Sequence, residues 1–97
     1  MQIGAARLTF HLPENGSLKG KRQVSRSLVS RLRQRFNVAV AEVDEQDKWQ
    51  TLVLGVACVS NQRQHTSQML DAVLDYLYTL DLDAELVAVE RETLGGV

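Results

Sequence analysis

The residues of this chain with the most evident chemistry are the cations of one segment, residues 17–36. Seven of the chain's eleven Lys and Arg residues lie there, and residues 15–41 contain no acidic residue. Cations repeated along one side of a helix can contact successive phosphates of a nucleic acid. We therefore predict an anion-binding surface that binds RNA. Its candidate contact residues are Lys19, Lys21, Arg22, Arg26 and Arg33.

The alternative interpretation of this segment is a solvated helix face whose charges only keep the protein soluble. A surface helix stabilised by its own ion pairs would carry a glutamate four residues before an arginine, and the segment has none. Residues 16–20 also place free backbone N–H groups at the start of the helix, where anions bind well. These observations favour the anion-binding interpretation.

Trp49 is the second candidate, and it is predicted to stack on a base or to anchor an interface. It lies in a polar segment, between Lys48 and Gln50. An exposed tryptophan often serves as an interface anchor or a stacking platform. The alternative is that Trp49 folds back and closes one end of the core, because tryptophan in proteins is highly buried on average.

No arrangement of residues in the sequence indicates catalysis or metal binding. The two histidines, His11 and His65, have no Cys or His at a ligand spacing. Cys58, the only cysteine, alternates with the core side of its segment and is expected to be a small buried hydrophobe. We therefore expect a protein that is not an enzyme, with no catalytic residues, no metal and no cofactor.

An acidic cluster follows the basic segment, and it has two interpretations. It could bind a cation or steer a basic partner, but a solvated hairpin is the commoner explanation. The cluster consists of Glu42, Asp44, Glu45 and Asp47.

Length and composition indicate one folded domain. The chain has 97 residues, of which 44% are hydrophobic, and a formal net charge of −1. Residues 62–97 carry seven acidic residues against two arginines, so the molecule has a basic end and an acidic end. A single free thiol, the lack of a signal sequence at the N-terminus and the lack of a long apolar run indicate a cytoplasmic protein without a membrane association.

The pattern of apolar residues predicts the elements that position these side chains. Alternation of apolar residues predicts strands, and a helical period predicts helices. The predicted strands are 2–12, 38–43, 51–59 and 84–92, and the predicted helices are 17–36 and 62–80. This order, βαββαβ, predicts an α+β, ferredoxin-like fold: a four-stranded antiparallel sheet with both helices on one face. We expect a single domain over residues 1–93 and a flexible tail over residues 94–97.

One face of this sheet is expected to carry no helix. The outward residues are predicted to be Arg7, Thr9 and His11 on the first strand, and Val53, Gly55, Ala57 and Val59 on the third. No aromatic residue is among them, which disfavours the base stacking used by RNA-recognition domains of this topology. An open apolar face more often pairs with another subunit, so homodimerisation is a second hypothesis. Gly55 indicates a bulge or a close approach by another element.

Four blocks of the sequence resemble one known family. They are Ser17-Leu18-Lys19 with Lys21-Arg22, Arg31-Leu32-Arg33 with Arg35-Phe36-Asn37-Val38, Ala41-Glu42-Val43 with Asp47, Trp49 and Gln50, and Gly55-Val56 with Val59-Ser60-Asn61. Together they resemble the YlxP-like proteins, a small bacterial family classed as domain of unknown function 503. The resemblance extends from Gln2 to about Glu92, and it departs at Gly20, where the family commonly has an acidic residue.

The resemblance implies a ferredoxin-like fold and an association with translation, because family members tend to be encoded beside translation-initiation and ribosome-maturation factors. Combined with the basic segment, it leads to one expected function. The chain is predicted to be a non-enzymatic binding protein that contacts structured ribosomal RNA, in small-subunit maturation. The alternative is a homodimerisation or protein-interaction module that uses the open sheet face and binds no nucleic acid.

Overall fold

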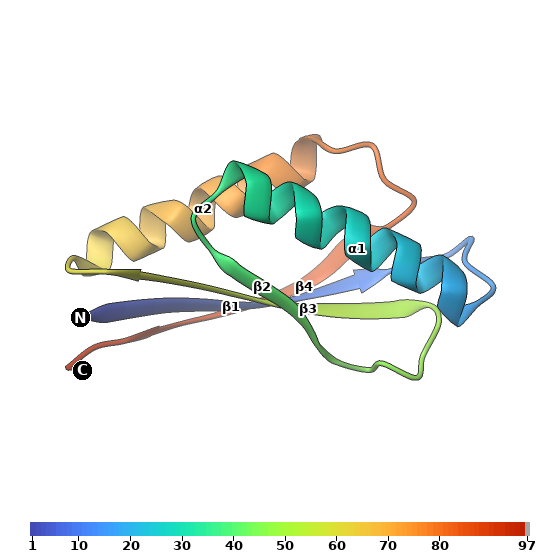
Figure 1. The fold of residues 1–97 in the computed structure, drawn as a ribbon, viewed down its shortest axis with the longest axis horizontal. Helices are drawn as coiled ribbons and strands as arrows, with labels where there is room; N and C mark the ends of the chain where they lie inside the picture. The colour runs from blue at the N-terminus through green and yellow to red at the C-terminus, as the bar shows by residue number, and fades with distance from the viewer. Residues whose placement is uncertain (97) are drawn as a thin grey trace.

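The protein forms two layers, a four-stranded sheet and two helices that cover one of its faces (Figure 1). The structure is a computed structural model, and it describes residues 1–96. The elements are β1 (Gln2–His11), α1 (Leu18–Arg35), β2 (Ala39–Asp44), β3 (Thr51–Ser60), α2 (Arg63–Thr79) and β4 (Glu85–Leu94). The sheet order is β2-β3-β1-β4, and all neighbouring strands are antiparallel. The predicted ferredoxin-like α+β fold is confirmed.

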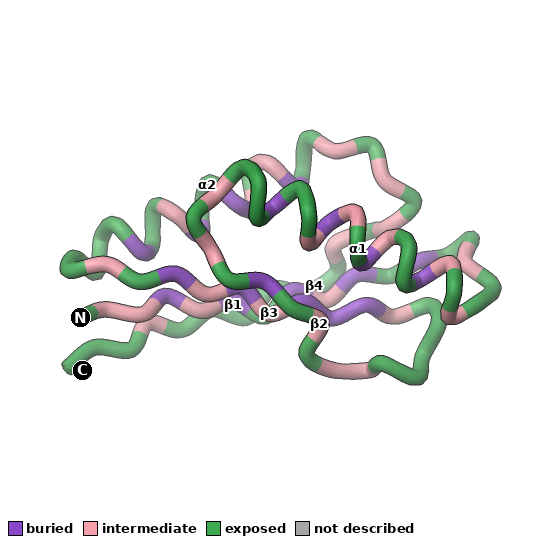
Figure 2. The backbone as a smooth tube through the Cα atoms, in the orientation of Figure 1, coloured by how far each residue is buried: buried purple, intermediate pink, exposed green. Residues whose placement is uncertain are grey.

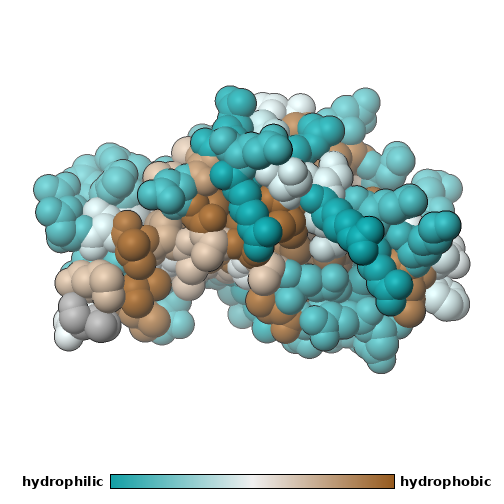
Figure 3. Space-filling model, viewed as in Figure 1, coloured by the Kyte–Doolittle hydropathy of each residue, from teal (hydrophilic) through white to brown (hydrophobic). Residues whose placement is uncertain are grey.

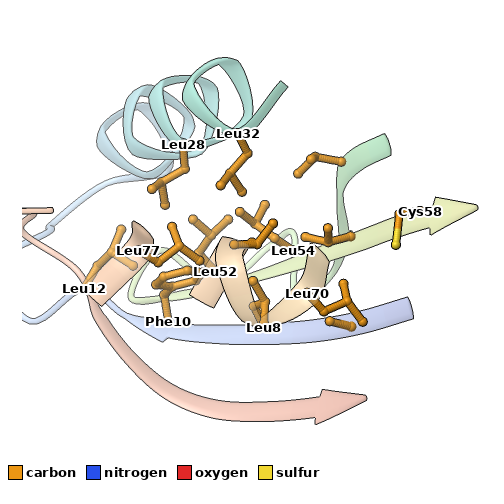
Figure 4. Close-up of a cluster of buried hydrophobic side chains, with 14 residues drawn as sticks. Leu8, Phe10, Leu12, Leu28, Leu32, Leu52, Leu54, Cys58, Leu70 and Leu77 are labelled. Carbon is orange, nitrogen blue, oxygen red and sulfur yellow. The ribbon is translucent and has the colours of Figure 1, made fainter. Parts of the chain in front are cut away.

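The hydrophobic core lies between the helices and the sheet. Alternate residues of β1 and β3, such as Leu8 and Leu54, are fully buried and face the helices. Leu28 from α1 and Leu70 from α2 point toward these strands (Figure 4). Cys58 is buried in the same layer, as the sequence predicts.

Helix α1 begins at a side-chain cap. The hydroxyl of Ser17 accepts a hydrogen bond from the backbone N–H of Gly20 at 3.0 Å, the usual role of a serine directly before a helix. A Cβ added at Gly20 would lie 2.1 Å from Oδ1 of Asn15. Glycine at this position therefore lets the Asn15 side chain lie against the first turn of α1.

A bulge lies in β2 rather than in β3. The pairing of β2 with β3 shifts register between Glu42 and Asp44. A Cβ added at Gly55 would lie 2.8 Å from Cγ1 of Val43. Of the two interpretations of Gly55, the close approach is therefore correct, and the element that approaches is β2.

Strand β4 is a long, largely exposed edge of the sheet (Figure 2). It runs to Leu94, which pairs with Ile3 of β1, so the predicted tail over 94–97 begins inside the strand. Val97, the last residue of that predicted tail, lies outside the described residues. Neither α1 nor α2 is long and apolar enough to cross a membrane.

Candidate nucleic-acid interface

Four of the five predicted RNA-binding residues share the exposed face of α1. Lys19, Arg22, Arg26 and Arg33 are all exposed, whereas Leu28 and Leu32 on the other side of the helix are fully buried. Hydrophilic side chains accordingly line the outer side of α1 (Figure 3). The amphipathic period of the helix produces this separation, because residues three, four and seven apart share one face.

Three of these cations have no side-chain partner among the described residues. Lys19, Arg22 and Arg26 make no side-chain hydrogen bond, ion pair or ring contact within residues 1–96, a property that only Arg63 shares among the described Lys and Arg residues. The cause is local, since α1 contains no acidic residue that could pair with them. Their ammonium and guanidinium groups are therefore free to meet anions from outside.

A shallow hollow lies between two of the arginines. It has a volume of about 340 Å³, and its lining residues are Ser25, Arg26, Val29, Ser30, Arg33 and Gln34. The serine hydroxyls and the Gln34 amide add neutral hydrogen-bond donors to the two guanidinium groups. None of these three polar residues was predicted for the site. The sequence could have indicated Ser30, because it lies four residues after Arg26 and therefore shares the same helix face.

Arg33 has a structural contact as well as an exposed position. Its Nη2 atom donates to the backbone carbonyl of Val40 at 2.7 Å, and this carbonyl belongs to the edge strand β2. The contact covers a polar group of the sheet edge and joins the end of α1 to β2. A guanidinium carries five N–H donors, so most of them remain available after this bond.

Lys21 is wrongly placed in the predicted site. Its side chain is only 2% exposed, and its Nζ atom lies among the backbone of the β2–β3 loop. The ammonium donates to the carbonyl oxygens of Glu45 at 2.6 Å, Lys48 at 2.7 Å and Thr51 at 3.1 Å. Because all three of its protons are used, Lys21 cannot contact an external phosphate.

The carboxylate of Glu42 completes the environment of Lys21. Its Oε2 atom lies 3.1 Å from Nζ of Lys21 and is buried without a hydrogen bond of its own. The short distance and the missing hydrogen bond are consistent, because the three carbonyls already accept the three ammonium protons of Lys21. Glu42 therefore stabilises Lys21 through its negative charge. A helical wheel could have revealed this role, since Lys21 lies seven residues before the buried Leu28.

The acidic cluster is largely neutralised by cations from several elements. Glu42 lies beside Lys21 of α1, as described above. Asp44 is paired with Arg7 of β1, and Glu45 lies 2.7 Å from Nζ of Lys48. The hydrogen bond from the Arg7 guanidinium, followed by one from a backbone N–H, lowers the pKa of Asp44 below its usual value. Within residues 1–96, no three His, Cys, Asp or Glu side chains gather in a way that could hold a metal ion.

The side chain of Trp49 is 52% exposed. It therefore does not fold back to close one end of the core, and its ring is accessible from outside. It lies in the β2–β3 loop and lines a shallow hollow of about 350 Å³ with its neighbours in residues 47–51. Its backbone carbonyl accepts a hydrogen bond from the Asn15 side chain, which also donates to the Ser17 carbonyl at 2.7 Å. Asn15 and Lys21 thus fasten the loop that carries Trp49 to the first turn of α1.

The remaining cations of α1 point away from the exposed basic face. Arg35 stacks on the ring of Tyr76 from α2, with its guanidinium carbon 4.5 Å from the ring centroid. Arg31 donates to the hydroxyl of Ser27 at 3.3 Å.

Comparison with known proteins shows the family of this chain. Residues 3–91 match the family described as "Protein of unknown function (DUF503)". The chain belongs to this family. It is also 37% identical, over 75 residues, to the "Uncharacterized protein YlxP" of Bacillus subtilis (strain 168), an alignment that covers 77% of this chain and 82% of that protein. The resemblance to YlxP-like proteins is therefore confirmed.

Proposed function

We propose that this DUF503 protein is a non-enzymatic, cytoplasmic protein that binds structured RNA through the exposed face of α1. The observation that carries the proposal is a set of three exposed cations without a side-chain partner in the part of the chain that the structure describes: Lys19, Arg22 and Arg26. Elsewhere in the protein, cations such as Arg7 and Arg91 are paired with carboxylates. Exposed cations that pair with nothing inside the protein are suited to release counterions from a phosphate backbone.

The shape of the face favours a double-stranded or otherwise structured RNA. Helix α1 has 18 residues and is therefore about 27 Å long, which allows contacts with several phosphates along one groove. The sheet's open face has no aromatic residue on its strands, so recognition would rest on the RNA backbone and its shape. The tendency of YlxP-like proteins to be encoded beside translation-initiation and ribosome-maturation factors supports ribosomal RNA and small-subunit maturation as the setting.

Trp49 extends this proposal to an unpaired base. It is half exposed on a loop that Asn15 and Lys21 hold against the beginning of α1. An unpaired base next to the RNA phosphates bound by α1 would stack on the indole ring of Trp49 at the beginning of this helix. Stacking on an aromatic ring contributes about 1–3 kcal/mol per base.

The proposal is tested by charge reversal on the basic face. Arg22→Glu with Arg26→Glu should weaken binding to small ribosomal subunits at least about tenfold, because two phosphate contacts are replaced by repulsion. The slope of log K against log salt should become shallower by about 1.4–1.8, since each of the two lost contacts removes about 0.7–0.9. Co-sedimentation across a salt series measures both quantities, and quenching of Trp49 emission reports stacking.

Arg31→Glu with Arg63→Glu is the matched control. It changes the net charge of the protein by the same amount, but both residues lie off the basic face. We expect this variant to retain most of the affinity and the salt slope. Equal losses in the two double variants would mean that net charge alone drives binding, and unchanged binding in the Arg22–Arg26 variant would refute the proposed interface.

A further inference from the structure

The sheet face opposite the helices carries a protruding apolar row at one end. Val59 of β3 and Leu94 of β4 each pair directly with Ile3 of β1, so the three side chains lie side by side across the sheet. Val59 is 64% exposed and Leu94 is 45% exposed. No helix covers them in the described part of the chain, since α1 and α2 both lie on the other face (Figure 1).

Next to this row the same face is hollowed by small residues. Ala5 pairs with Ala57, and Ala57 pairs in turn with Ala39, which forms a row without any large side chain across β1, β3 and β2. Ala41 and Gly55 continue the small residues into the next row. These five residues, together with Val43 and with Arg33 of α1, are among those that line a shallow hollow of about 560 Å³.

The arginine in the middle of this face is compensated by carboxylates, whereas Glu92 of the edge strand β4, which pairs with Ala5, makes no ion pair within residues 1–96. Arg7 lies between two carboxylates: it is paired with Asp44 of β2, and its Nε atom lies 3.9 Å from Glu90 of β4. Compensated charges cost less to remove from water than single ones. Val53, which the sequence places on this face, is only 2% exposed, so the exposed apolar surface lies at Val59, Leu94 and β2 instead.

We propose that a second copy of this chain packs against this face, sheet to sheet, with the protruding row of each copy seated in the hollow of the other. A two-fold axis requires one patch to carry both a protrusion and a complementary recess. The row at Val59, Ile3 and Leu94 and the hollow at Ala57 and Ala41 meet that requirement, because they are adjacent on one face. A partner of unrelated sequence would need only one of the two features.

The dimensions of the face suit a dimer. Three strands of ten residues and one of six, at about 3.3 Å per residue and about 4.8 Å apart, give a flat area of about 570 Å². A corrugated surface has a larger accessible area than its flat projection. The face therefore approaches the roughly 800 Å² per partner that a stable protein interface buries, and two sheets would pack about 10 Å apart.

The dimer is independent of the proposed RNA binding. Arg33 of α1 lines the hollow as well as the basic face, but Lys19, Arg22 and Arg26 are not among the residues that line it, so each copy would present these three cations outward (Figure 1). Loss of RNA binding would leave the dimer intact, and loss of the dimer would leave each basic face intact.

Sedimentation velocity of the full chain between about 2 and 200 µM tests the dimer. The wild type should approach twice the 10.9 kDa mass of one chain. Val59→Asp places a charge in the protruding row, and Ala41→Glu fills the hollow. Both residues are exposed in the single chain, so folding should tolerate both changes. Each variant should raise the dimer dissociation constant at least about tenfold.

Tyr78→Glu is the matched control. Tyr78 is a large, exposed apolar residue on α2, on the helix side of the sheet. This variant should dimerise like the wild type, and far-UV circular dichroism should show that all three variants are folded. A wild type that stays monomeric at the highest concentration would overturn the proposal. So would dimers that Val59→Asp and Ala41→Glu leave unchanged, because the contact would then lie elsewhere on the molecule.

Discussion

Lys19 and Lys21 are two residues apart on α1, yet they have opposite environments. Lys19 is exposed and its side chain makes no hydrogen bond or ion pair within residues 1–96, whereas Lys21 is buried and donates to three carbonyls of the β2–β3 loop. An ammonium group with three donors suits a site where three carbonyl oxygens converge. The same residue type therefore lies on the outer surface at Lys19 and stabilises the fold at Lys21.

We predict that Lys21→Met lowers the free energy of unfolding by about 2–4 kcal/mol. The change leaves three carbonyls without their donor and leaves the Glu42 carboxylate in a largely buried site without a counter-charge. Urea denaturation followed by circular dichroism measures the loss. Lys19→Met is the control and should change stability by less than about 0.5 kcal/mol.

A second substitution separates charge burial from packing at this site. Adding Glu42→Gln to Lys21→Met should restore part of the lost stability, because it removes the uncompensated carboxylate. If the double variant is no more stable than Lys21→Met, the Glu42 charge contributes little and the three carbonyls account for the effect.

At the scale of the elements, α2 packs against β1 at a point where only glycine fits. A Cβ added at Gly4 would lie 2.8 Å from Cβ of Thr66 and 3.2 Å from Sγ of Cys58. Cβ of Thr66 is attached directly to the helix backbone, so it cannot move away without moving α2. The distance between this helix and the sheet is therefore set partly by the missing side chain at Gly4.

We predict that Gly4→Ala destabilises the protein by about 1–3 kcal/mol, because the added methyl group overpacks the contact between β1 and α2. Gly16→Ala is the matched control, since a Cβ there has nothing within 4 Å. It should leave the midpoint of urea unfolding nearly unchanged. Equal midpoints for the two variants would show that α2 can shift at little cost.

At the scale of the whole molecule, the two layers keep the proposed surfaces apart. The basic face lies on the outer side of the helix layer, and the apolar row and hollow lie on the outer side of the sheet (Figures 1 and 3). A face-to-face dimer would thus carry two basic faces on opposite sides. Two such faces could bind one RNA at two places.

This arrangement predicts an effect of valency on RNA affinity. The wild type should bind an RNA with two linked copies of a binding hairpin at least about tenfold more tightly than an RNA with one copy, because the second contact is intramolecular. Val59→Asp should abolish that difference and leave the affinity for the single hairpin unchanged. Fluorescence anisotropy with both RNAs measures the ratio. A loss of affinity for the single hairpin in Val59→Asp would contradict the separation of the two surfaces.

Much of the architecture could be predicted from the sequence, because it depends on local periodicity. The alternation around Leu8 and the helical spacing of Leu28 and Leu32 are enough to predict β1, α1 and the ferredoxin-like order. The Ser17 cap and the exposed basic face of α1 are local for the same reason. Each of these features involves residues that are close together in the chain.

Only the tertiary structure decided the roles that depend on residues far apart in the chain. Lys21 has the residue type of a phosphate ligand, but the β2–β3 loop, more than twenty residues away, supplies the carbonyls that occupy it. The exposure of Trp49 and the approach of Val43 to Gly55 likewise depend on where a distant segment folds back. A charged group contacts whatever polar partner the fold brings within hydrogen-bond distance, and sequence periodicity carries no information about that distance.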